Sequence, residues 1–382
     1  MERNVPKLRF KGFNDEWQLS NLKKLCDINP KSKELPDKFV YIDLESIIDG
    51  VLIKKNIIEL KDAPSRAQRL LNVGDVLFQT VRPYQMNNYL FEYELNYKSV
   101  ASTGYAQLRC KNCISNNKFI YQALHNKKFN NKVMLRCTGT SYPAINSSEL
   151  VTIPLRIPSL QEQERIANFL TKVDKIIEKQ EEKVKNLENY KKGMMQKIFS
   201  QEIRFKDENG NEYPEWEEKR LGKIIVNKNK GGNALYCDYE ANILLSNEYL
   251  EKKVSNITYV SNTIDVYENH ILILWDGSQS GKVYTGVRGV LGSTFVSIEL
   301  DKFNNNIFVY QYLNYKKNLI QEVWREGSGV PHVAKDFINN FKIFLPCLEE
   351  QVKISEVLNK IDLLQEKETN KLENLRQLKK GL

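Results

Sequence analysis

The chain contains one long segment twice, and this internal repeat constrains the fold more than any other feature. Residues 139–193 align with residues 327–381 at a constant offset of 188, without a gap. Between residues 157–194 and residues 345–382, 16 of the 38 aligned pairs are identical. A period this long indicates two copies of a whole domain with its following helix, not a solenoid of short units. Two similar binding surfaces are therefore expected in one chain.

The repeated tail is predicted to form one long helix in each copy, because apolar residues recur at alternating steps of three and four. The first seam comprises Ile166, Leu170, Val173, Ile177, Val184, Leu187, Met194 and Ile198, with Gln180 and Lys191 at its two remaining positions. The second comprises Ile354, Leu358, Ile361, Leu372, Leu375 and Leu382, with polar breaks at Gln365, Glu368 and Lys379. A helix with one narrow apolar stripe needs a partner. We expect the two copies to pair with each other; the alternative is a coiled coil with another chain.

A region of about 150 residues precedes each helix and is long enough for its own core. Both regions share short β-rich runs, a segment that starts a helix at Phe119 or Phe308, and a closing Gly-x-x-x-Pro at residues 139–143 or 327–331. The segments between these features diverge. This pattern predicts an α+β fold: domain 1 (residues 1–157), helix 1 (158–199), domain 2 (200–345) and helix 2 (346–382). Divergent loops on a shared scaffold suggest one task performed on two targets.

The charge balance favours a polyanionic partner. Lys and Arg number 57 against 48 Asp and Glu, for a net charge of +9, which points to nucleic acid ahead of a membrane surface. No apolar run approaches the roughly 18 residues of a membrane span, and the N-terminus lacks the features of a signal peptide. The six cysteines are scattered and only Cys110 and Cys113 form a CxxC, so reduced, structural cysteines and a cytoplasmic location are expected, with no metal site.

These features together resemble the specificity subunit of a type I restriction–modification enzyme. The resemblance covers essentially the whole chain and rests on the duplicated Pro-x-Leu-(Gln/Glu)-Glu-Gln phrase at residues 158–163 and 346–351, with Gly-Asp-Val-Leu-Phe at 74–78 as a weaker sign. One departure is that the second copy stops at Leu382 where the first continues through residues 195–199; pairing is still expected along most of its length.

The resemblance implies that the two variable regions are target recognition domains, each reading one half of a bipartite, asymmetric site in double-stranded DNA. It implies that the helices pack antiparallel as a spacer and carry two methyltransferase subunits, through which nuclease and translocase subunits join the complex. Helix length would then act as a ruler, since B-DNA advances about 34–36 Å per turn.

Residues with paired donors and acceptors are the natural readers of base edges. In domain 1 they gather in the segment after a predicted strand at residues 79–89, in the turn at 138–142 and in a third segment at 65–69. The candidate DNA-binding residues are Arg66, Gln68, Arg69, Gln79, Thr80, Arg82, Tyr84, Gln85, Asn87, Asn88, Gly139, Thr140, Ser141 and Tyr142. The alternative for each segment is an ordinary solvated turn.

In domain 2 the counterpart is the segment at residues 275–282, again directly after a predicted strand, together with residues around the second Gly-x-x-x-Pro. The candidates are Lys228, Lys230, Gly277, Ser278, Gln279, Ser280, Lys282, Arg325, Ser328 and His332. Lys228 and Lys230 are expected to contact backbone phosphates, and His332 is weighed against a plain packing or surface role.

The sequence contains no Asn-Pro-Pro-aromatic or Asp-Pro-Pro-aromatic tetrapeptide, no Gly-x-Gly-x-x-Gly cofactor loop and no Walker phosphate loop. Asp37, Glu59 and Lys61 superficially fit a nuclease carboxylate pattern, which chance often produces. We therefore expect a binding subunit without catalytic residues or cofactors of its own, with S-adenosylmethionine, ATP and Mg²⁺ in partner subunits. The competing hypotheses are a stand-alone DNA nuclease and a scaffold of two adaptor domains that does not bind DNA.

Overall fold

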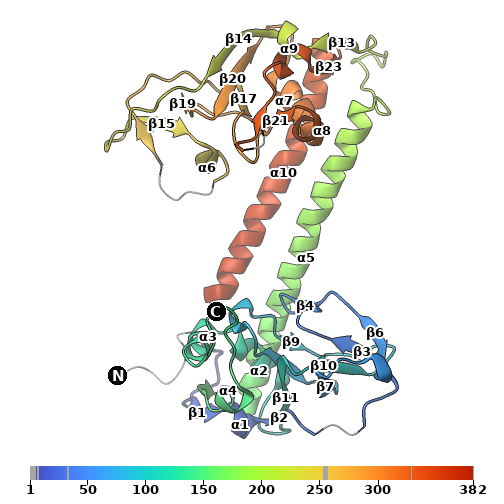
Figure 1. Cartoon of the computed structure of the whole chain (residues 1–382), viewed down its shortest axis with the longest axis vertical. Coiled ribbons are helices and arrows are strands. Elements are labelled where there is room, and N and C mark those ends of the chain that lie inside the picture. The colour runs from blue at the N-terminus through green and yellow to red at the C-terminus, as the bar shows by residue number, and fades with distance from the viewer. Residues whose placement is uncertain (1–5, 7, 32–33, 253–256, 328, 382) are drawn as a thin grey trace. The chain divides into compact units, whose positions relative to one another are not determined.

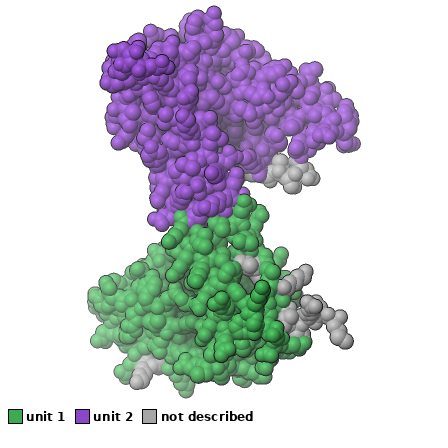
Figure 2. Space-filling model, turned by 180° about the vertical axis from the view of Figure 1, so that it is seen from behind, with its two compact units in different colours: residues 1–179, 374–382 green, residues 180–373 purple. Residues whose placement is uncertain are grey.

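The computed structural model describes the chain except for residues 1–5, 7, 32–33, 253–256, 328 and 382. The chain divides into two compact units (Figure 2): unit 1 contains residues 1–179 and 374–382, and unit 2 contains residues 180–373. Each unit therefore includes one of the two regions that precede the long helices and a part of both helices, α5 (Leu160–Phe199) and α10 (Leu348–Gly381).

The domain of unit 1 is built on two four-stranded sheets with the orders β6-β3-β10-β7 and β2-β11-β8-β9, plus the pairs β1-β12 and β4-β5. Its strands are β1 (Gln18–Asn21), β2 (Cys26–Ile28), β3 (Lys38–Ile42), β4 (Ile47–Ile48), β5 (Val51–Leu52), β6 (Asn56–Glu59), β7 (Ala67–Leu70), β8 (Val76–Gln79), β9 (Tyr89–Leu90), β10 (Ser99–Ser102), β11 (Tyr105–Cys110) and β12 (Pro154–Ile157). Its short helices are α1 (Leu22–Leu25), η1 (Leu60–Asp62), η2 (Pro83–Gln85), α2 (Asn117–Leu124), α3 (Lys127–Met134) and α4 (Ser147–Leu150).

The domain of unit 2 has sheets with the orders β14-β20-β17-β18 and β16-β15-β19, plus the pairs β13-β23 and β21-β22. Its strands are β13 (Glu217–Arg220), β14 (Ile225–Lys230), β15 (Asn242–Leu245), β16 (Tyr259–Val260), β17 (Ile271–Leu274), β18 (Val283–Thr285), β19 (Val290–Leu291), β20 (Phe295–Leu300), β21 (Arg325–Glu326), β22 (His332–Val333) and β23 (Lys342–Leu345). Its short helices are η3 (Leu221–Lys223), α6 (Asn247–Leu250), α7 (Asn306–Tyr315), α8 (Lys317–Val323) and α9 (Phe337–Asn340).

The two domains share a framework. The antiparallel pair β8–β11 in unit 1 corresponds to β17–β20 in unit 2, and β1–β12 corresponds to β13–β23. The helix that follows each central pair begins at an asparagine N-cap, Asn116 for α2 and Asn305 for α7, whose side chain accepts from the backbone N–H of Phe119 or Phe308. The predicted start of an equivalent helix in each domain is therefore confirmed.

The long helices follow the predicted heptad pattern. All ten predicted seam positions of α5 from Ile166 to Ile198 are buried or half-buried, and so are the described seam positions of α10 from Ile354 to Lys379; Leu382 lies outside the described residues. Within unit 2, Lys183 contacts Glu368 and Lys191 contacts Asp362, so residue numbers rise on α5 as they fall on α10. The pairing is thus antiparallel and intramolecular, which confirms the α+β fold with paired helices (Figure 1).

The duplicated Glu-Gln of the repeat attaches each domain to the first turn of its long helix. Glu162 is 1% exposed and accepts two hydrogen bonds of 2.7 Å from Arg9, while Glu350 is 0% exposed and accepts from Arg204 at 2.9 and 3.0 Å. The next residue, Gln163 or Gln351, accepts from the backbone N–H of Asn116 or Asn305. The phrase recurs because the same two connections are made in both halves.

Within the described ranges, no helix combines the length and the apolar character that crossing a bilayer would require.

Candidate nucleic-acid interface

In unit 1 the segment after β8 (residues 79–89) is held against the Gly-x-x-x-Pro turn (residues 139–143) and the two residues that follow it. We call these two joined segments the clamp. The backbone N–H of Arg82 donates to the carbonyl of Pro143 at 2.7 Å, and that of Ile145 donates to the carbonyl of Thr80 at 3.0 Å. Val81 and Ala144 form an antiparallel bridge between the two segments. Two segments more than fifty residues apart, both singled out from the sequence, therefore lie together.

The clamp presents a cation on an aromatic ring. Arg82 has a left-handed backbone conformation, with φ at 54°, and its guanidinium carbon lies 4.4 Å from the centroid of the Tyr142 ring. Tyr142 is 62% exposed and Tyr84, two residues beyond Arg82, is 51% exposed. Stacking on a ring favours a fixed orientation of the planar guanidinium, which leaves its N–H groups available to an acceptor. Thr140 and Ser141 are exposed beside Tyr142.

Several predicted DNA-binding residues of this segment instead face inward and shape the loop. Gln79 is 1% exposed, donates to Val81 O and Gln85 Oε1 at 2.8 Å, and accepts from the backbone N–H of Asn87. Asn88, also 1% exposed, accepts from the backbone N–H of Gln79. Thr80 is 7% exposed and its hydroxyl donates to Gly104 O. A buried amide must satisfy its own donors and acceptors, and here the loop itself supplies the partners.

The third predicted segment, residues 65–69, reaches the same cluster through the turn between β10 and β11. The carbonyl of Arg66 accepts from Thr103 N and that of Gly104 accepts from Thr80 N, both at 2.9 Å. Gln68 donates to Ser65 O at 2.7 Å. Burial lowers the pKa of Arg69, and its Nε is a buried donor with no hydrogen-bond partner among the described residues. An anionic oxygen would satisfy this donor.

Unit 2 repeats the clamp with the same backbone hydrogen bonds. Gly277 N donates to Pro331 O at 2.8 Å, as Arg82 N does to Pro143 O, and Asp276 forms an antiparallel bridge with His332. Gly327 has a φ of +92°, against +90° at Gly139. A Cβ on Gly327 would lie 2.7 Å from the carbonyl oxygen of Val330, so glycine is required in this turn. The two clamps share a backbone but place glycine in unit 2 where unit 1 has Arg82.

The remaining candidates of unit 2 differ in exposure. Lys228 and Ser278 are exposed, Gly277 is half-buried, Arg325 donates to Ser278 O at 3.3 Å, and Lys230 lies 3.6 Å from Asp276 Oδ2. His332 is half-buried, with Nε2 3.8 Å from Glu326. Gln279 Oε1 and the Ser280 hydroxyl are buried without a hydrogen-bond partner among the described residues. Ser328 lies outside those residues.

Lys282, another predicted DNA-binding residue, forms an ion pair within the domain. Its ammonium lies 2.6 Å from Glu251 Oε1, which also accepts from the Tyr284 hydroxyl at 2.6 Å. The charge of Lys282 is thus compensated within the domain, by a residue that directly follows α6. The sequence motif did not reveal this, because Glu251 is 31 residues away in the sequence.

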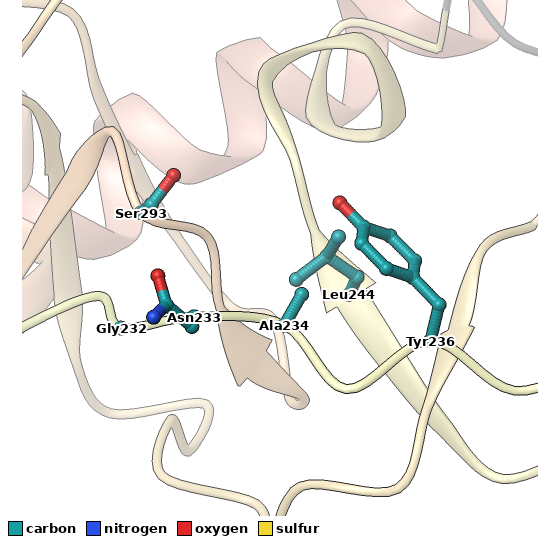
Figure 3. A pocket seen from close by; sticks show the side chains of 6 residues that line it. All are labelled: Gly232, Asn233, Ala234, Tyr236, Leu244 and Ser293. Carbon is teal, nitrogen blue, oxygen red and sulfur yellow. The ribbon is translucent and has the colours of Figure 1, made fainter.

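The domain of unit 2 also contains a pocket that sequence reasoning missed. It has a volume of about 310 Å³ and is lined by Gly232, Asn233, Ala234, Tyr236, Leu244 and Ser293. Figure 3 shows Ser293 and Asn233 on one side and Leu244 and Tyr236 on the other. Tyr236 is 72% exposed. The sequence feature that could have indicated this pocket is the pair Gly231-Gly232 directly after the basic strand β14. A Cβ on Gly231 would lie 1.9 Å from Gly292 O. The backbone at Gly231 therefore lies directly against the turn between β19 and β20.

The alternative nuclease residues show no special arrangement. Glu59 forms an exposed ion pair with Lys61 at 2.8 Å. Across the described residues, no three His, Cys, Asp or Glu side chains gather in a way that could hold a metal ion. All six cysteines are free.

Comparison with known proteins assigns the family. The family model for the type I restriction modification DNA specificity domain matches residues 14–189 and again residues 213–376. The chain therefore belongs to the type I restriction–modification DNA specificity family, as a specificity subunit with two such domains.

Two curated relatives come from Methanocaldococcus jannaschii. The type I restriction enzyme MjaVIII specificity subunit is 35% identical over 191 residues, a match that spans 48% of this chain and only 45% of the relative. The putative MjaX specificity subunit is 25% identical over an alignment that covers 100% of this chain and 95% of the relative.

Two solved structures share the fold. The type I restriction–modification S subunit from M. genitalium has a TM-score of 0.66 at 16% identity and covers 99% of this chain and 97% of its own. A chain from a study of the assembly and conformational transition of a type I R-M system has a TM-score of 0.58 at 20% identity and covers 96% of both chains.

Proposed function

We propose that this chain reads a bipartite, asymmetric site in double-stranded DNA, with the clamp of each domain contacting one half-site. The observation that carries the proposal is that one chain builds the same clamp twice, through Arg82–Pro143 and Gly277–Pro331, and fits it with different side chains. Identical backbones with different side chains suit two targets of the same chemical kind. The exposed clamp residues Tyr84 and Tyr142 would contact DNA, together with the exposed cations Arg66 and Lys228 outside the clamps. The buried residues would position them.

The long helices would set the gap between the half-sites. At a rise of 1.5 Å per residue, the 40 residues of α5 make a helix about 60 Å long, which is between one and two turns of B-DNA. The net charge of +9 supports phosphate contacts that would supply much of the affinity and make it fall with salt.

The helices also offer two equivalent docking positions outside the seam. Ile176 and Tyr190 occupy the same heptad position on α5, 52% and 56% exposed, and their counterparts Leu364 and Leu378 on α10 are 42% and 57% exposed. Charged residues are usual at such flanking positions, so exposed apolar side chains there would suit a protein partner. Two copies of one methyltransferase subunit would dock there, with nuclease and translocase subunits joining through them.

Catalysis would belong to those partners. Methyl transfer from S-adenosylmethionine, and cleavage driven by ATP with Mg²⁺, need cofactor sites that this chain is not expected to form. The complex would act in the cytoplasm, where chromosomal DNA is accessible.

The decisive experiment is methylome sequencing of cells that carry this chain with an active methyltransferase subunit, against cells that lack the chain. We expect a split motif with a fixed gap that disappears with the chain. Exchanging residues 79–89 and 138–143 together should change one half-site only. If methylation proves independent of the chain, or both half-sites change, the proposal is wrong.

A second experiment tests the docking positions. Leu364→Glu and Ile176→Glu should each reduce the complex from two methyltransferase subunits to one in native mass spectrometry, and the double variant should retain none. Glu366→Gln should leave two bound, because Glu366 is exposed and its ion pair with Lys252, at 3.5 Å, is a surface contact of small energy.

A further inference from the structure

The centre of the helix pair is a buried polar contact between residues that are counterparts in the repeat. Gln180 and Glu368 differ by the repeat offset of 188, and they are 6% and 7% exposed. Gln180 Nε2 donates to the Glu368 backbone oxygen at 2.9 Å and to its Oε2 at 2.7 Å, while Lys183 Nζ lies 2.7 Å from Oε1. Lys183 and then Gln180 hold the pKa of Glu368 below its ordinary value.

Two further ion pairs between the described parts of the helices do not distinguish one helix from the other. Lys191 contacts Asp362 in unit 2, and Lys379 contacts Asp174 in unit 1. Asp174 and Asp362 are counterparts in the repeat, and so are Lys191 and Lys379. Each helix therefore carries the same aspartate and the same lysine. Two copies of α5, or two copies of α10, could form these contacts equally well.

The central position distinguishes the two helices in charge, because α5 carries an amide there and α10 a carboxylate. Two α10 helices would bring two buried carboxylates to one point, which is unfavourable in a low-dielectric site. Two α5 helices would bring amides together and leave Lys183 without its carboxylate. Pairing α5 with α10 alone gives the buried charge both an amide donor and an ammonium partner.

We propose that the contact of Gln180, Lys183 and Glu368 selects the pairing of α5 with α10 over the pairing of either helix with a second copy of itself. α10 would thus pair more favourably with α5 than with the α10 of a second chain. A single polar position in a helical seam is a known means of choosing a partner at some cost in stability.

The proposal predicts opposite effects for two sets of substitutions. Glu368→Gln removes the carboxylate repulsion and allows two α10 helices to pair. Adding Gln180→Glu to Glu368→Gln moves the carboxylate to α5, where Lys371 on α10, the counterpart of Lys183, can neutralise it. The double variant should therefore regain mixed pairing. Asp362→Asn is the matched control, since it makes the same acid-to-amide change in a contact that does not discriminate.

The experiment starts from the full chain with a protease site inserted at Gly210, in an exposed turn where a Cβ would meet nothing within 4 Å. The chain is cleaved after folding, and isotope-labelled and unlabelled nicked proteins are mixed in urea sufficient to exchange their halves, then returned to buffer. Native mass spectrometry counts mixed pairs and pairs of identical halves. The label shows that the halves exchanged.

Wild-type protein should give mixed pairs almost exclusively. Glu368→Gln should raise the ratio of α10-half homodimers to mixed pairs at least about tenfold, equivalent to about 1.4 kcal/mol, and the double variant should restore the wild-type ratio. Asp362→Asn should leave the ratio unchanged. Fully exchanged Glu368→Gln halves that still pair as in wild type, or an equal rise with Asp362→Asn, would overturn the proposal.

Discussion

Replacing Glu350 by alanine should loosen the attachment of the second domain to α10. The carboxylate is fully buried and accepts from Arg204 at 2.9 and 3.0 Å and from the Trp216 indole at 3.1 Å. Removing one partner of a buried ion pair typically costs about 3–5 kcal/mol, because the other charge stays buried without compensation. Arg204 keeps Pro214 O at 2.7 Å as an acceptor, which places the expected loss near the lower end, about 3 kcal/mol.

The assay is urea unfolding combined with hydrogen exchange. With a denaturant slope of about 2–3 kcal/mol per molar, a loss of about 3 kcal/mol moves the midpoint of unit 2 by about 1 M. Amides of β13, which follows Trp216 in the sequence, should exchange faster. Glu349→Ala is the control, because Glu349 is the exposed neighbour of Glu350. A loss below about 1 kcal/mol would refute the view that the contact of Glu350 with Arg204 attaches the domain to α10.

Three further predictions concern the DNA surface, the pocket and the helix pair. Arg82→Ala should weaken DNA binding and lower the salt slope by about one unit if the guanidinium contacts a phosphate; an unchanged slope in binding assays would remove Arg82 from the interface. Gly231→Ala should lower the melting temperature of unit 2, since its Cβ would lie 1.9 Å from Gly292 O, whereas Gly232→Ala meets nothing within 4 Å and should be neutral. Because Lys183, Gln180 and Lys371 hold the pKa of Glu368 below its ordinary value, the contact should stabilise the helix pair above a pH of about 4.3 and lose this effect as the pH falls further. Thermal unfolding at a series of pH values should show this loss in wild type and not in Glu368→Gln.

The long helices were predictable because their determinants are local. A heptad pattern depends on residue type at fixed spacing, and every described seam position from Ile166 to Ile198 and from Ile354 to Lys379 is at least half-buried. The offset of 188 likewise aligned Glu162 with Glu350 in the sequence. The repeat alone did not give their partners, since Arg9 and Arg204 are about 150 residues away in the sequence.

The candidate surface was predictable as a set of segments but not as individual side chains. Residues 79–89 and 138–142 were both singled out, and the structure joins them through Arg82 and Pro143. Composition could not separate Gln79, which is buried and bonded within its loop, from Tyr84, which is exposed. Whether a side chain of this loop faces inward or outward depends on the conformation of the loop backbone. Contacts with residues distant in the sequence fix that conformation.

The sequence by itself determined a duplicated architecture, two helices that need each other, and the family to which the chain belongs. The tertiary structure alone decided which side chains face outward, that Arg82 and Gly277 occupy equivalent places, and that Gln180 meets Glu368. The physical reason is the distance along the sequence over which each kind of interaction acts. Periodicity and propensity act within a few turns of chain, whereas burial, ion pairing and loop closure depend on which distant segments the packed core brings together.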